Sequence, residues 1–284
     1  MSERNNEQRL AVDQSVSVSA EKKQEVKQDP LSFLSPTHIV ELPSKGKFYS
    51  VGHPLHNKES IEIRFMTAKE EDILTSKALL KKGVALDRMI ESLLVDKSIN
   101  IDDLFLGDKN AIIVAARVTG YGAEYETKVQ CPSCGATVKH SFDLNNLKHS
   151  HISEDCEKQL LEKGTFTVQL PLSKLSVEVR PLKGIDEKAL TRMAEERKAL
   201  GKTGDSMITD QLRAFIASIN DVKDRVTINR FVDICPAGDS RVLRNKYSEI
   251  SPNIDLKQKF VCKSCDSEME MEVPFTVDFF WSGR

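Results

Sequence analysis

Apolar and polar residues alternate in several short segments of the chain, and segments with helical spacing lie between them. Residues 61–65 alternate as a half-buried strand does, and a short strand is predicted before them at residues 38–42. Apolar residues recur at helical spacing from Ile73 to Leu80, which predicts one helix that ends at Gly83. A second helix is expected to carry its apolar residues on one face: Leu86, Met89, Ile90, Leu93 and Leu94.

The start of the first predicted helix carries a polar motif. Thr67 and Glu70 have the spacing of a capping box, in which a hydroxyl and a carboxylate close the first turn together. The acidic run Glu70-Glu71-Asp72 suits a helix N-terminus, where the helix dipole favours negative charge. We therefore expect a solvated helix start here and not an acid–base pair for catalysis.

Two β-hairpins are predicted further along the chain, each with a C-x-x-C sequence at its turn. The first joins residues 124–130 to residues 137–142, and the second joins residues 256–261 to residues 268–273. The cysteines at the two turns are Cys131, Cys134, Cys262 and Cys265.

The second half of the sequence repeats features of the first. The interval from Gly107 to Cys131 is identical to the interval from Gly238 to Cys262, and an aspartate follows the glycine in both copies. Upstream, an arginine that ends a predicted strand is followed by an acid at the same spacing in both halves: Arg64 and Glu70, then Arg180 and Asp186. The arginine lies farther from the cysteine pair in the second copy than in the first, because the helical part of the second copy contains an insertion.

This repeat predicts the fold class and the domain organisation. We expect an α+β protein of two repeated strand–helix–hairpin halves related by pseudo-twofold symmetry. The halves are residues 36–148 and 165–284, and residues 149–164 link them. Residues 1–35 are rich in Glu, Gln, Lys and Ser and carry few large apolar groups, so a disordered polar tail is expected there.

Composition narrows the class of protein. The 284 residues are 39% hydrophobic and 30% charged, a normal soluble balance, and the formal net charge is −2. A chain this close to neutral has no long-range attraction for nucleic acid. No apolar run approaches the roughly 18 residues of a membrane span, so no membrane contact is expected. The N-terminus lacks the apolar core of a signal peptide, which predicts a cytoplasmic protein where it is made.

The paired cysteines favour a metal over disulfides in a chain without an export signal. Two C-x-x-C turns supply four sulfurs, the donor set that structural zinc prefers in tetrahedral geometry. We therefore predict one structural zinc ion bound by Cys131, Cys134, Cys262 and Cys265, built from two zinc knuckles. Redox-active dithiols compete with this interpretation, but they normally stand at a helix N-terminus. A catalytic zinc would need an open coordination position, which four cysteines leave no room for.

The remaining candidates for chemistry are weak. Cys156 lies near His149 and His151, but the charged segment around it favours a solvated loop over a second metal site, and Cys235 is expected to be a small core residue. Gly201-Lys202-Thr203 resembles part of a phosphate-binding loop, but Glu196 stands where the motif requires its first glycine. The sequence therefore predicts no catalytic residue, no small-molecule substrate and no enzyme.

Several motifs in the first half resemble a known family. Residues 42–49 read Leu-Pro-Ser-Lys-Gly-Lys-Phe-Tyr, and residues 63–74 continue from Ile63-Arg64-Phe65 to Ile73-Leu74. Together with Gly107-Asp108, Arg117, Tyr121-Gly122 and the first C-x-x-C turn, this order is similar to the baseplate hub and hub-assembly proteins of T4-type contractile-tailed bacteriophages. The similarity is best over residues 38–145 and returns at the second cysteine pair and at Phe279-Phe280-Trp281.

The resemblance implies an assembly role. We expect a non-enzymatic virion assembly protein that builds or forms part of the baseplate hub and binds other hub proteins in the host cytoplasm. The resemblance does not distinguish a subunit that stays in the virion from an assembly factor that leaves afterwards. Residues 42–49 are interpreted either as a contact surface with Phe48 and Tyr49 as anchors or as a structural turn. The C-terminal aromatic cluster is open to the same two interpretations.

The alternative function is a zinc-ribbon module that binds nucleic acid. It would need a basic face beside the knuckles. Lysines and a histidine supply some positive charge there: Lys128, Lys139, His140, Lys257, Lys259 and Lys263. Glutamates of the same strands oppose it: Glu124, Glu126, Glu268, Glu270 and Glu272. Nucleic acid is therefore an unlikely partner by charge.

Overall fold

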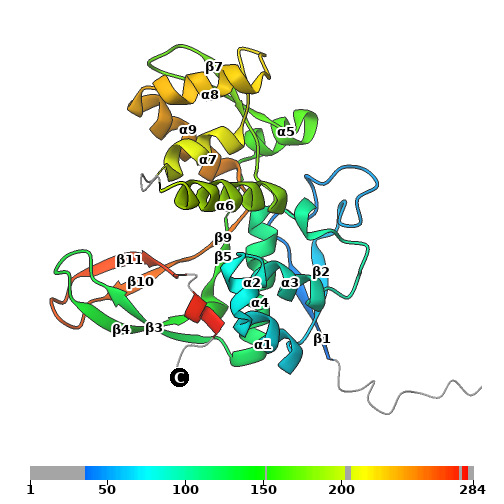
Figure 1. Ribbon diagram of the computed structural model, residues 1–284, viewed down its shortest axis with the longest axis vertical. Helices are drawn as coiled ribbons and strands as arrows, with labels where there is room; N and C mark the ends of the chain where they lie inside the picture. Colours follow the sequence, from blue (N-terminus) through cyan, green and yellow to red (C-terminus); the bar gives the residue numbers. More distant parts are fainter. Residues whose placement is uncertain (1–35, 151, 202–205, 275–276, 281–284) are drawn as a thin grey trace, which may run out of the picture. The chain divides into compact units, whose positions relative to one another are not determined.

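The computed structural model describes residues 36–150, 152–201, 206–274 and 277–280 (Figure 1). The predicted tail at residues 1–35 lies outside these residues, as do His151, Lys202-Thr203 and Trp281. The described part is a mixed α/β structure whose sheets have two or three strands. Among its helices, none is long and apolar enough to cross a bilayer.

The first half of the chain begins with an antiparallel pair of strands, β1 (Thr37–Glu41) and β2 (Ser60–Arg64). Helical segments follow in the predicted order: α1 (Ala68–Thr75), α2 (Lys77–Lys81), α3 (Ala85–Leu93), η3 (Ile101–Asp103) and α4 (Leu106–Tyr121). The prediction of a single helix before Gly83 is therefore wrong. Ser76 takes an extended conformation, with φ −63° and ψ 106°, and divides that segment into α1 and α2.

The capping box at the start of α1 is confirmed, but the prediction that the acids there are solvated is wrong for Glu70. Glu70 is fully buried. Its carboxylate accepts hydrogen bonds from the Thr67 N–H at 2.9 Å, from the Thr67 hydroxyl at 2.6 Å and from the Ser92 hydroxyl at 2.6 Å. Burial alone raises the pKa of Glu70, but these donors outweigh it and hold the pKa below the usual value. Asp72 is exposed, as expected.

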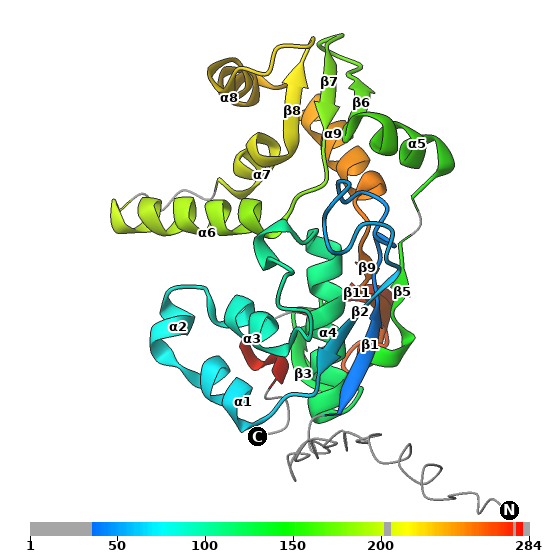
Figure 2. The same ribbon diagram turned by 90° about the vertical axis from the view of Figure 1, so that its right-hand side faces the viewer.

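The second half carries a three-stranded antiparallel sheet, which Figure 2 shows with its strands side by side. Its strands are β6 (Phe166–Gln169), β7 (Ser176–Val179) and β8 (Ile216–Ile219). The helices of this half are α5 (Glu154–Lys163), α6 (Gly184–Ala199), α7 (Met207–Phe215), α8 (Arg225–Ile234) and α9 (Ala237–Ile250). Helix α5 occupies the segment expected to be a loop around Cys156, and the Cys156 side chain is 5% exposed.

Apolar side chains form two separate cores. The first gathers residues from β1, β2, α3 and α4, together with both predicted hairpins and Phe279-Phe280. The second gathers residues from α5, α7, α8, α9 and the three-stranded sheet. The hairpin near the C-terminus thus packs with the first half of the chain. Phe48 is half-buried and contacts both cores.

Helices α4 and α9 carry the repeated Gly-Asp pair in their first turn, and both aspartates are fully buried. Asp108 accepts hydrogen bonds from the Ser44 N–H at 2.9 Å, the Ser44 hydroxyl at 2.6 Å and the Tyr49 hydroxyl at 2.7 Å. Asp239 accepts bonds from the N–H groups of Leu172 at 3.0 Å and Ser173 at 2.8 Å. Each aspartate therefore ties the first turn of its helix to the loop that follows the first strand of its half.

Glycine is required beside Asp108 because another chain segment passes close by. A Cβ atom on Gly107 would lie 1.8 Å from the carbonyl oxygen of Pro252. Any side chain there would push apart α4 and the segment that leads into the second hairpin.

Tyr49 anchors the loop at residues 42–49 inside the protein. Its side chain is 2% exposed, stacks on His53 with ring centres 4.4 Å apart, and donates to Asp108. The interpretation of Tyr49 as a partner anchor is therefore wrong. Phe279 and Phe280 are also buried, at 2% and 4% exposed, so they dock on the first core.

Candidate metal centre

The two predicted hairpins are present and lie side by side (Figure 1). The first consists of β3 (Glu124–Gln130) and β4 (Thr137–Asp143), and the second of β10 (Lys257–Val261) and β11 (Glu268–Glu272). A reciprocal pair of hydrogen bonds joins them, because Gln258 accepts from the Asp143 N–H at 3.1 Å and donates to its carbonyl at 2.7 Å.

Alternation along the strands gives each hairpin one apolar face. Tyr125, Val129 and Phe142 point into the first core from the first hairpin, and Phe260 does so from the second. His140 packs edge-on against Phe260, with ring centres 5.1 Å apart. The inner faces therefore hold the hairpins together along their length, and the two C-x-x-C turns lie at the same end.

Both turns use the same backbone geometry. The Gly135 N–H donates to the Cys131 carbonyl at 2.8 Å, and the Asp266 N–H donates to the Cys262 carbonyl at 2.9 Å. Gly135 and Asp266 both have positive φ, 73° and 54°. Glycine adopts this conformation without strain, and aspartate tolerates it better than most residues do. The turn thus directs both cysteine side chains of a pair to one side.

The four predicted ligands are brought together. Their sulfur atoms all lie within 4.8 Å of one another. Across the hairpins, the sulfurs of Cys131 and Cys265 are 3.9 Å apart and those of Cys134 and Cys262 are 3.8 Å apart. A tetrahedral ion with metal–sulfur distances of about 2.3 Å holds its sulfurs about 3.8 Å apart, so the spacing fits a single ion.

Neighbouring groups lower the thiol pKa of two cysteines at this site but raise that of Cys134 to about 11, where the Ala136 N–H lowers the pKa and hydrogen bonds with the neighbouring sulfurs, that of Cys265 first, outweigh it. The pKa of the Cys265 thiol is lowered to about 6, first by the Ser267 hydroxyl, which lies 3.3 Å from its sulfur. The Cys262 sulfur accepts the Ser264 N–H at 3.4 Å. Cys131 also has a lowered pKa, because the N–H of Cys134 faces its sulfur. A thiolate, and not a thiol, is the form that binds a metal ion.

Two of the four cysteines are buried and two are exposed. Cys131 and Cys262 are buried, and Cys134 and Cys265 are exposed. The cluster therefore lies where the first core meets solvent, with one buried and one exposed cysteine from each turn. No other group of three or more His, Cys, Asp or Glu side chains with such spacing occurs in the described part of the chain. Cys156 lies apart from this group, in the second core.

Comparison with known families decides the class of protein. The family model described as "T4 bacteriophage base plate protein" matches residues 35–281. The chain belongs to this family. The resemblance seen in the sequence is thereby confirmed at the level of the base plate family, and contact with other phage baseplate proteins follows from it. No curated protein and no solved structure matches the chain.

The hairpin surface of this base plate protein carries balanced charge. Lys139 lies 3.7 Å from Glu126, and Lys259 lies 2.8 Å from Glu268. Two of the five lysines that would contact phosphates are thus paired with glutamates of the neighbouring strand, which weakens the nucleic-acid alternative.

Sequence reasoning missed other side chains that position the site. Arg117 is 2% exposed, and its guanidinium donates to the carbonyls of Gly122 at 2.6 Å, Glu124 at 3.0 Å and Phe279 at 2.8 Å. It therefore fixes the start of the first hairpin to the C-terminal aromatic pair. The available signal was an arginine that directly follows the apolar run of residues 111–116 in the sequence.

Proposed function

We propose that this protein is a non-enzymatic component or assembly factor of the baseplate hub of a contractile phage tail. It is made in the host cytoplasm and acts by binding other hub proteins as the baseplate forms. Membership in the base plate family supports the baseplate role. The hub assignment rests on the motifs at residues 42–49 and 63–74, which resemble hub and hub-assembly proteins.

One structural zinc ion holds the two hairpins together in this proposal. The observation that carries it is the cluster of four sulfurs, all within 4.8 Å, contributed by two turns. Thiolate donors at tetrahedral spacing suit zinc, and a closed set of four leaves no position for a substrate. The ion would close a long chain segment between the two turns, so its binding energy would add to the stability of the fold.

We further propose that the two halves arose by duplication and are related by pseudo-twofold symmetry. In both halves an arginine at the end of a strand faces an acid near the start of the next helix: Arg64 lies 4.0 Å from Glu70, and Arg180 lies 2.7 Å from Asp186. The buried aspartates of the two Gly-Asp pairs hold equivalent loops. On this proposal residues 36–148 and 165–284 are the halves, and zinc joins their hairpins as two knuckles.

Baseplate assembly in the infected cell tests this function. A phage that carries Cys131→Ser should lose zinc from the protein and fail to complete the hub, because the hairpin surface is no longer fixed. Cys156→Ser is the matched control, since Cys156 lies apart from the cluster. Normal baseplates in the Cys131→Ser phage would refute the proposed role of zinc. Salt-dependent binding of the purified protein to DNA would instead favour the nucleic-acid alternative.

A further inference from the structure

A pocket of about 680 Å³ lies at the seam between the two cores, and the proposed function does not use it. Its apolar lining draws on both cores: Phe105, Ile254 and Leu256 belong to the first, and Leu182 and Tyr247 pack with the second. The short ladder between β5 (Lys148–His149) and β9 (Ile254–Asp255) forms part of its wall. A ligand in this pocket would contact both halves of the chain.

Arg244 is the residue that points to a ligand. It lies on α9, lines the pocket, and has a buried Nε that makes no hydrogen bond within the described residues. No ion pair involves its guanidinium in that part of the chain either. Buried donors in native proteins are nearly always satisfied, and an unpaired one is costly. The two terminal nitrogens of the guanidinium are not enclosed in the same way and have no partner among the described residues, and a carboxylate fits a guanidinium with two parallel hydrogen bonds.

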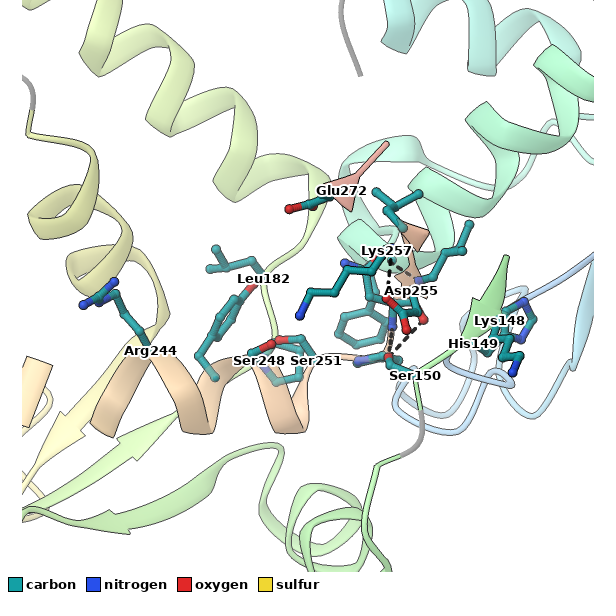
Figure 3. A pocket seen from close by; sticks show the side chains of 18 of the residues that line it. Lys148, His149, Ser150, Leu182, Arg244, Ser248, Ser251, Asp255, Lys257 and Glu272 are labelled. Atoms are coloured by element: carbon teal, nitrogen blue, oxygen red, sulfur yellow. Dashed lines mark hydrogen bonds between the residues drawn. The ribbon is translucent and has the colours of Figure 1, made fainter. Parts of the chain in front are cut away.

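Two lysines add to the positive charge of the lining. Figure 3 shows Lys257 between Arg244 at one end of the pocket and Lys148 at the other. Neither lysine makes an ion pair with the residues that the structure describes. Asp255 and Glu272 also line the pocket, so three cations face two acids. With so small an excess, recognition depends on direct pairing at Arg244 more than on long-range attraction.

The size and walls of the pocket exclude a lone anion as its natural occupant. A single carboxylate or phosphate would leave most of the volume and the apolar wall uncovered. A short peptide that carries an acid between apolar side chains would satisfy both parts of the lining. Since a baseplate protein contacts other baseplate proteins, such a segment has an obvious source.

We propose that this pocket docks a short segment of another baseplate protein, in which an Asp or Glu side chain pairs with Arg244 and adjacent apolar side chains pack on Leu182 and Leu256. The proposal rests on the proposed function, because the partner is taken to be another baseplate protein. A segment bound here would also hold the two cores in one relative arrangement.

Overlapping synthetic peptides from the other baseplate proteins of the same phage provide the test. The purified full chain is added to the peptide array, and the dissociation constant of each positive peptide is measured by fluorescence anisotropy. Peptides with an acid among apolar residues should bind. Arg244→Gln and Lys257→Glu should each weaken binding by about tenfold or more, and so should replacing the acid of the peptide by its amide. Lys257 is exposed, so we expect its substitution to leave the fold intact, and circular dichroism of the variant checks this.

Matched controls lie on the same two elements. Arg241→Gln changes an exposed arginine of α9, and Lys259→Glu changes an exposed lysine of β10, and neither residue lines the pocket. Both should bind as the unaltered protein does. Binding that ignores the acid of the peptide, or that survives Arg244→Gln and Lys257→Glu, overturns the pocket proposal and leaves the proposed function standing. If the full chain binds no intact baseplate protein either, both proposals fall.

Discussion

The sulfur atoms of Cys131 and Cys265 lie 3.9 Å apart although 134 positions separate them in the sequence. Cys134 and Cys262 form the matching contact at 3.8 Å. Each close pair thus joins one hairpin to the other, and neither lies within a single turn. An ion at this point would bind the hairpins to each other as well as closing each turn.

If the proposed zinc ion holds the hairpins together, its removal should loosen the hairpins before it affects the second core. Isolated two-stranded hairpins are marginal in water, and these two share a small apolar face with their neighbours. After a chelator is added, amide protection in β3, β4, β10 and β11 should fall by about tenfold or more, whereas β6, β7 and β8 should keep theirs. Hydrogen exchange followed by mass spectrometry measures both regions at once. Equal loss of protection in the hairpins and in the three-stranded sheet would contradict the prediction that the metal stabilises the hairpins first.

Asp108→Ala should destabilise the fold strongly. The change leaves the Ser44 N–H, the Ser44 hydroxyl and the Tyr49 hydroxyl without their acceptor inside the protein. We expect a loss of about 3 kcal/mol in the free energy of unfolding, measured by urea denaturation at neutral pH. Asp72→Ala on the exposed face of α1 is the control and should cost less than about 0.5 kcal/mol. Similar losses for the two variants would show that the buried aspartate does not organise the loop.

Arg117→Met should release the C-terminal aromatic pair from the first core. Methionine fills much of the same space but leaves three carbonyls without their donor, those of Gly122, Glu124 and Phe279. The expected cost is about 3 kcal/mol in the free energy of unfolding, again from urea denaturation. The control is Arg88→Met, since Arg88 is exposed and its ion pair with Glu91 contributes at most about 1 kcal/mol. A cost for Arg117→Met no larger than that of the control would be inconsistent with the role described.

The sequence predicted the hairpins and the gathering of the four cysteines well because local signals agree there. Strict alternation marks the strands, and residues 124–130 match β3 in full. The cysteine spacing and the repeated Gly-Asp pair then indicated which turns should meet. These signals are all short-range or periodic, and each one was readable without knowledge of tertiary contacts.

The errors arose where tertiary contacts decide the outcome. Glu70 looks like a solvated acid, but Ser92 and Thr67 provide donors that make its burial possible. The break at Ser76 has no Gly or Pro to mark it in the sequence. Helix α5 is charged on its outer face and meets the second core through Cys156 and Leu160, which is too narrow an apolar face to identify in advance. Nothing in the sequence distinguishes Arg244. Its lack of hydrogen-bond and ion-pair partners among the described residues is a property of the tertiary structure.

Native mass spectrometry of the purified full chain tests the central claim most directly. We predict one zinc ion per chain, lost in both Cys131→Ser and Cys262→Ser and retained in Cys156→Ser and Cys235→Ser. Loss in both ligand variants would show that one ion depends on both hairpins. A folded, unaltered protein without zinc, or a zinc ion that survives Cys262→Ser, would contradict the shared four-cysteine site.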